Sequence, residues 1–114
     1  VIPCFNEEII IDDFIDELNK NISEIDEDFE VIFVDNKSND KTVFKIKDKF
    51  KIFKNSKIIC LTNYFGNVIE AHKRTSKNFR GIRCPIPDKF NDDNLNNFKL
   101  FIKNKTRLLR RVFF

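Results

Sequence analysis

Carboxylates follow two apolar segments of this chain, at positions where they could accept hydrogen bonds from a bound molecule. Asp35 comes directly after the uninterrupted apolar run of residues 31–34, and Glu7 follows the apolar residues 1–5. A continuous run of β-branched and aromatic residues indicates a strand that is buried on both faces, and such strands belong to parallel sheets flanked by helices. Ligands bind at the carboxyl edge of these sheets, because the loops there vary while the sheet stays rigid. Both carboxylates are therefore candidate binding groups.

Each carboxylate also has a purely structural interpretation. Asp35 could cap the turn that leads into a second helix, since aspartate side chains accept hydrogen bonds from nearby backbone groups. Glu7 could be an acid in the first turn of a helix, where it would interact with the positive end of the helix dipole. The residues alone leave both interpretations open.

The elements that must position these groups alternate between strand and helix. Asn6 is predicted to be the N-cap of a long amphipathic helix, with Glu7 and Glu8 in its first turn. Ser38 or Asn39 is predicted to cap the second helix, with Asp40 in its first turn. Units of this length require right-handed crossovers and a parallel sheet. The predicted strands are residues 1–5, 30–35 and 57–61. The first two helices have predicted apolar faces of Ile11, Phe14, Ile15, Leu18, Ile22 and Ile25, and of Val43, Ile46, Phe50 and Phe53. A third helix is predicted over residues 65–77.

The pattern changes beyond Asn78. Pro85 and Pro87 interrupt the segment where a fourth strand is expected, and proline cannot donate to a central ladder. The final segment predicts one or two basic amphipathic helices, which we expect to pack against the core, the alternative being a helix on a membrane surface. Its apolar positions are Leu95, Phe98, Phe101, Ile102, Leu108, Leu109 and Val112.

Composition limits the class of protein. The 114 residues form at most one domain, and three widely spaced cysteines without a CxxC pair indicate a reducing compartment. The two glycines form neither a dinucleotide-binding turn nor a phosphate-binding loop. No apolar run has membrane-spanning length, so we expect a soluble, cytoplasmic protein, with the basic end as a possible contact to the membrane face. Fourteen phenylalanines without interleaved tyrosine or arginine predict a core, and no nucleic-acid partner is expected.

Three segments together resemble family 2 glycosyltransferases, the GT-A group that includes dolichol-phosphate mannose synthases and bacterial polyprenyl-phosphate sugar transferases. Residues 34–42, VDNKSNDKT, resemble the family segment VDDGSxDGT. Residues 1–8, VIPCFNEE, resemble VIPxYNEE, and residues 61–67, LTNYFGN, resemble LSRNFG. The resemblance implies an incomplete GT-A, Rossmann-like α/β fold: a three-layer sandwich with a parallel sheet and a helical C-terminal tail. Residues 1–80 would be the nucleotide-sugar-binding domain, and residues 81–114 a degenerate or truncated segment.

The same resemblance implies a function and a site. The function is inverting transfer of a hexose from a UDP or GDP sugar to an acceptor such as a polyprenyl phosphate. The nucleotide pocket would consist of Pro3, Phe5, Glu7 and Asp35, with Asn36 in place of the family's second aspartate. No segment matches the one that carries the family's catalytic base, so the catalytic residue is unknown.

A divalent metal, magnesium or manganese, is also implied by the resemblance. Asp88 falls where the family has the first aspartate of its Asp-x-Asp pair, and Phe90 occupies the second place. Asp92 and Asp93 are alternatives, although acids in an asparagine-rich loop are typical turn residues. Because this pair is incomplete, a second hypothesis is a non-enzymatic relic that acts as a binding or interaction module.

Overall fold

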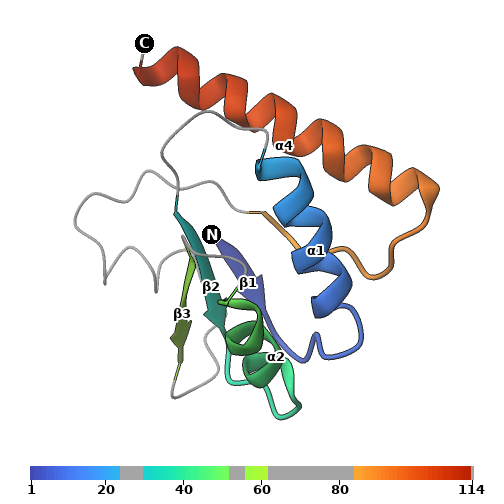
Figure 1. Ribbon diagram of the computed structural model, residues 1–114, viewed down its shortest axis with the longest axis vertical. Helices are drawn as coiled ribbons and strands as arrows, with labels where there is room; N and C mark the ends of the chain where they lie inside the picture. Colours follow the sequence, from blue (N-terminus) through green and yellow to red (C-terminus); the bar gives the residue numbers. More distant parts are fainter. Residues whose placement is uncertain (24–29, 52–55, 62–83, 114) are drawn as a thin grey trace.

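The sheet of this protein is parallel, as the sequence predicts. A computed structural model describes residues 1–23, 30–51, 56–61 and 84–113 (Figure 1). Within them, the strands β1 (Ile2–Cys4), β2 (Val31–Asp35) and β3 (Ser56–Cys60) form one sheet in the order β1-β2-β3. Cys4 pairs with Asp35, and Asp35 pairs with Cys60. The three strands therefore end at one edge, and the predicted α/β class is confirmed.

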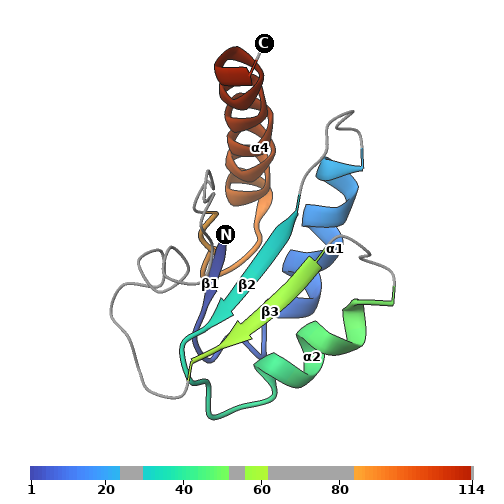
Figure 2. The ribbon, with the colours of Figure 1, turned by 90° about the vertical axis from the view of Figure 1, so that its left-hand side faces the viewer.

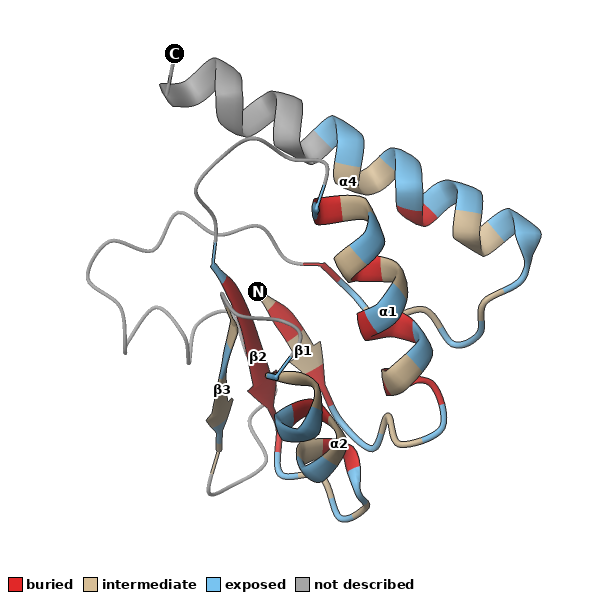
Figure 3. Cartoon of the chain, in the orientation of Figure 1, coloured by how far each residue is buried: buried red, intermediate tan, exposed pale blue. Residues whose placement is uncertain are grey.

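The central strand β2 is buried along its whole length, which explains its uninterrupted apolar sequence. On one face, Val31 and Phe33 join the main hydrophobic core. On the other face, Ile32 and Val34 form a second cluster with partly buried neighbours. Figure 3 shows that buried residues concentrate in β1 and β2 and on the inner side of the first helix. A strand with apolar contacts on both faces is held rigidly, and so are the residues at its carboxyl end.

Two helices, α1 (Ile11–Ile22) and α2 (Thr42–Lys49), cover the face of the sheet that carries the main core (Figure 2). The predicted inner face of α1 is confirmed wherever the structure describes it, and Ile46 of α2 is completely buried. The buried positions of α1 are Ile11, Phe14, Ile15, Leu18 and Ile22. Helix α2 ends at Lys49, so Phe50 packs against the core from just beyond it. Ile25, Phe53 and the predicted helix 65–77 lie outside the described residues.

Both predicted helix caps were wrong. Helix α1 begins at Ile11, five residues beyond Asn6, and residues 8–10 form a turn instead. Asn6 has a positive backbone φ of 52°, and its side-chain Oδ1 accepts a hydrogen bond from the backbone N–H of Asn39. Helix α2 begins at Thr42, beyond both Ser38 and Asn39, and the Ser38 hydroxyl oxygen accepts the backbone N–H of Asn6 instead. The side chains of Asn6 and Ser38 therefore bond to residues distant in sequence instead of capping a helix.

The chain after residue 83 returns to the same core. The backbone N–H of Cys84 donates a 2.8 Å hydrogen bond to the carbonyl of Val1, which places this segment beside β1. Residues 84–91 include no strand, as the two prolines predict. Cys4 and Cys84 are buried and Cys60 is exposed, and all three thiols are free.

A single helix, α4 (Asp92–Phe113), forms the C-terminal tail (Figure 1). Phe98 is buried in the main core, where its ring meets those of Phe14 and Phe90 at centroid distances of 5.5 and 6.0 Å. Phe101 and Ile102 pack against the same core. The prediction that the tail packs inward is thus confirmed up to Ile102. In the described parts of the chain, no helix combines the length and hydrophobicity that crossing a membrane requires.

Candidate functional site

An open pocket of about 190 Å³ lies at the carboxyl edge of the sheet. Its walls come from the end of β1, the loop after β2 and the segment that follows Cys84. Three of the four residues predicted to bind a nucleotide, Pro3, Phe5 and Glu7, are brought together here. The full lining consists of Pro3, Cys4, Phe5, Glu7, Asn36, Pro85 and Ile86.

Phe5 is an exposed aromatic residue in the lining of this pocket. Its side chain is 43% exposed, although most phenylalanines of a folded domain are buried. An accessible aromatic face beside a pocket can stack on a planar ring. The loss of the hydroxyl that the family's tyrosine carries leaves this stacking surface intact.

Glu7 is a half-buried carboxylate at the same pocket. Its burial, followed by the negative charge of Asp88, raises the pKa of Glu7, and Asp40 adds a smaller effect in the same direction. A backbone hydrogen bond involving Phe5 opposes these effects. Asp88 therefore lies near enough to Glu7 for the two charges to interact, while remaining exposed itself.

Asp35 lies at the same sheet edge but faces the loop that follows it. Its side chain is only 2% exposed. Oδ1 accepts a 2.6 Å hydrogen bond from the hydroxyl of Ser38, and Oδ2 accepts a 3.0 Å bond from the Ser38 backbone N–H. The pocket lining includes the next residue, Asn36, in place of Asp35. The sequence signal for Asn36 is its position directly after the buried strand β2, in place of the family's second aspartate.

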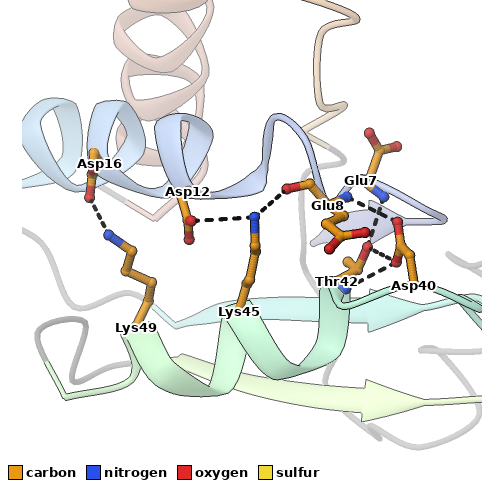
Figure 4. A network of polar contacts seen from close by, with 8 residues as sticks. All are labelled: Glu7, Glu8, Asp12, Asp16, Asp40, Thr42, Lys45 and Lys49. Atoms are coloured by element: carbon orange, nitrogen blue, oxygen red, sulfur yellow. Dashed lines mark hydrogen bonds and ion pairs between the residues drawn. The ribbon is translucent and has the colours of Figure 1, made fainter.

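Three consecutive backbone N–H groups of the loop that carries Phe5 and Glu7 donate hydrogen bonds to side chains between the end of β2 and the first residue of α2. The N–H of Asn6 donates to Ser38 Oγ at 2.9 Å. The N–H of Glu7 donates to Thr42 Oγ1 at 2.8 Å, and that of Glu8 donates to an Asp40 oxygen at 3.2 Å. Figure 4 shows the Glu7 and Glu8 contacts converging on the start of α2. These polar residues of the second segment hold the first segment in place.

Ion pairs continue the connection between α1 and α2 (Figure 4). Lys45 Nζ donates to the carbonyl of Glu8 at 2.8 Å and lies 3.7 Å from Asp12. Lys49 Nζ lies 3.1 Å from Asp16, whose hydrogen bond raises the pKa of the lysine. Pairs this exposed contribute little stability, about 0–1 kcal/mol each. They connect α1 to α2 at two places, Asp12 with Lys45 and Asp16 with Lys49.

The described residues do not assemble a full set of protein ligands for a divalent metal. Phe90, at the second place of the aspartate pair, stacks on Phe14 at a centroid distance of 6.4 Å and belongs to the core. Asp92 and Asp93 lie in the first turn of α4. Throughout the ranges that the structure describes, no three side chains of the His, Cys, Asp and Glu types gather as a metal would need. Hard cations require several oxygens in a fixed geometry, so the metal stays a prediction from the resemblance.

Comparison with known proteins gives one family. A protein-family model described as glycosyl transferase family 2 matches residues 1–71. This range contains β1, β2 and β3 and every pocket residue except Pro85 and Ile86. No curated protein and no solved structure matches the chain.

Proposed function

The chain belongs to glycosyl transferase family 2, and on this premise we propose that it binds a nucleotide-sugar donor for hexose transfer, with the nucleotide in the pocket at the sheet edge. The single observation that carries this proposal is the pocket itself. It lies at the carboxyl ends of parallel strands, where α/β folds bind ligands. The matched family range supplies most of its lining.

The chemistry of the lining suits a nucleoside. The exposed face of Phe5 would stack on the base, and the backbone at Pro3 would lie against its edge. The carboxylate of Glu7 accepts hydrogen bonds, and the amide of Asn36 both donates and accepts them. Sites for whole drug-sized ligands occupy roughly 300–1,000 Å³, so these walls would hold the nucleoside while the rest of the donor extends beyond them.

Asp35, the fourth residue proposed for nucleotide binding, would act indirectly. Because both of its oxygens accept hydrogen bonds from Ser38, its contribution would pass through the loop that it holds. This loop carries Asn36 on one side of Ser38 and reaches Asn6 on the other. The proposal therefore assigns direct contact to Pro3, Phe5 and Glu7, and loop support to Asp35.

The finer proposal concerns donor and acceptor. We infer a UDP or GDP sugar as donor and a polyprenyl phosphate as acceptor, as in members related to dolichol-phosphate mannose synthase. Helix α4 presents exposed Lys99 and Lys103, and a basic surface suits a phosphate at the cytoplasmic face of a membrane. Residues 1–80 would bind the donor, and residues 81–114 would complete one wall and the basic surface. Asp88 stays the candidate ligand for any magnesium or manganese ion.

Calorimetric titration of the chain with UDP and with GDP, each with and without manganese, tests this proposal. We expect one nucleotide to bind, and we expect Phe5→Ala to weaken binding about tenfold, because stacking on a base contributes about 1–3 kcal/mol. Phe44→Ala is the matched control, since Phe44 is 71% exposed on α2 and is not among the pocket residues. Manganese dependence that Asp88→Ala abolishes would support the metal prediction.

A folded chain that binds neither nucleotide would contradict the donor site. That result would favour the relic hypothesis, in which the chain acts as an interaction module.

A further inference from the structure

Thr42 connects the proposed pocket to the start of α2 while remaining completely buried. Its exposed fraction is 0%, so no ligand in the pocket can touch it. Its Oγ1 donates a hydrogen bond to Asp40 and accepts the backbone N–H of Glu7 at 2.8 Å. A hydroxyl has one proton to donate, so donation to the carboxylate leaves a lone pair for Glu7. The direction of both bonds is thereby fixed.

Asp40 is the second member of this arrangement. Its carboxylate accepts the N–H of Glu8 at 3.2 Å and the N–H of Thr42 at 3.0 Å, besides the Thr42 hydroxyl. Desolvation works against ionisation here, but these hydrogen bonds prevail and lower the pKa of Asp40. A charged acceptor that is shared among three donors stays ionised at neutral pH and holds them together.

The segment that these residues hold is also bonded at Asn6, to Ser38 and Asn39, and at the Glu8 carbonyl, to Lys45. Residues 5–10 lie between β1 and α1 and form neither strand nor helix, and Asn6 has a positive φ. A loop of this kind keeps one shape only when neighbouring groups hold its backbone. Phe5 and Glu7 lie in this loop, and the bonds made by Thr42 and Asp40 are the ones that hold the backbone N–H groups of Glu7 and Glu8.

We propose that Thr42 and Asp40 are positioning residues that set the shape of the nucleotide pocket by holding the backbone of Glu7 and Glu8. This inference rests on the proposed nucleotide site for its functional consequence. Its structural part stands on the contacts alone. The two residues act through the loop and touch no substrate.

Three single variants test the proposal. Thr42→Val keeps the side-chain shape and removes the hydroxyl, whereas Thr42→Ser keeps the hydroxyl and removes the methyl group. Ile46→Val is the control, because Ile46 is equally buried on α2 and belongs to the main hydrophobic core rather than to this polar network. The measurements are the Kd for UDP and GDP by calorimetry, the exchange rate of the Glu7 amide by NMR, and stability in urea.

We expect Thr42→Val to raise the Kd about tenfold and to speed exchange at Glu7 by a similar factor, because the Glu7 N–H loses its acceptor and one such bond contributes about 1 kcal/mol. Thr42→Ser should restore both values towards those of the native chain. Ile46→Val should lower stability and leave the Kd unchanged, which separates positioning from general destabilisation. A folded Thr42→Val variant with native Kd and native exchange would overturn the proposal.

The same experiment separates this inference from the proposed function. If the native chain binds neither nucleotide, the donor site fails, and the functional part of the inference fails with it. Faster Glu7 exchange in Thr42→Val, reversed in Thr42→Ser, would then still support the structural role. Unchanged exchange would refute that role too.

Discussion

The contact between Asp35 and Ser38 predicts a strong energetic coupling between a strand end and a loop. Asp35→Ala removes the acceptor of both the Ser38 hydroxyl and the Ser38 N–H. Ser38→Ala removes the hydroxyl bond and also the acceptor of the Asn6 N–H, but keeps the backbone bond. The two variants therefore share one interaction, the 2.6 Å hydroxyl–carboxylate bond.

The magnitude follows from the number and kind of bonds lost. A hydrogen bond to a charged group contributes about 1.5–3 kcal/mol, so we expect Asp35→Ala to cost about 3 kcal/mol and Ser38→Ala about 2 kcal/mol. Once Asp35 is absent, removing the Ser38 hydroxyl still loses the neutral hydrogen bond from the Asn6 N–H, about 0.5 kcal/mol. The double variant should thus cost about 3.5 kcal/mol rather than the sum of about 5 kcal/mol, a coupling of about 1.5 kcal/mol.

Urea denaturation of the native chain, both single variants and the double variant measures this coupling. Ser23→Ala is a suitable control, because the Ser23 hydroxyl donates only to the carbonyl of Lys20 on an exposed turn, and its loss should change stability by under about 0.5 kcal/mol. Additive costs would refute the reasoning, since they would mean that the Ser38 hydroxyl and the Asp35 carboxylate do not interact in the folded chain.

Two further predictions concern the tail and the pocket. Phe98→Ala should reduce the free energy of unfolding by about 3–5 kcal/mol, because a buried ring is removed. Leu100→Ala, at an exposed position of the same helix, should change it by under about 0.5 kcal/mol. If urea denaturation gives similar losses for the two variants, α4 is not packed against the core. Burial and Asp88 raise the folded-state pKa of Glu7 above its ordinary value of 4.5, so its contribution to stability is present below that value and is lost as pH rises through the raised pKa. Glu7→Gln should therefore gain stability relative to the native chain as the pH rises above 4.5, and a difference in urea denaturation that stays constant with pH would contradict this origin.

The sheet could be predicted because its signal is local. Residues 31–34 are apolar at every position, and burial on both faces of β2 is the direct reason. The inner face of α1 was equally clear, since side chains three and four residues apart share one side of a helix. These patterns depend on residues that are near one another in the chain.

The helix starts could not be predicted in the same way. Asn6 has the preferred type for an N-cap, but its side chain accepts the N–H of Asn39, 33 residues away. Ser38 is likewise taken by Asp35 and Asn6. Capping preferences describe isolated helices, and they fail where a loop from another strand competes for the same oxygen.

The candidate site was predicted in its residue types more than in its contacts. Pro3, Phe5 and Glu7 meet at one pocket, and they lie close together in the chain, within β1 and directly after it. The inward direction of Asp35 and the place of Asn36 at the pocket depend on how the chain turns after β2. No pattern in the sequence specifies that turn.

One feature of this turn bears on how such loops can be recognised. Lys37 has a positive backbone φ of 62°, at the place where the segment VDDGSxDGT has glycine. Holding a lysine in this left-handed conformation costs about 1 kcal/mol. The next residue, Ser38, donates its N–H to Asp35 and accepts the N–H of Asn6, and these bonds offset the strain. The loop therefore keeps a glycine conformation without a glycine. A search that demands the glycine would discard chains whose backbone still fits, whereas one that demands a hydrogen-bonded pair like Asp35 and Ser38 would keep them.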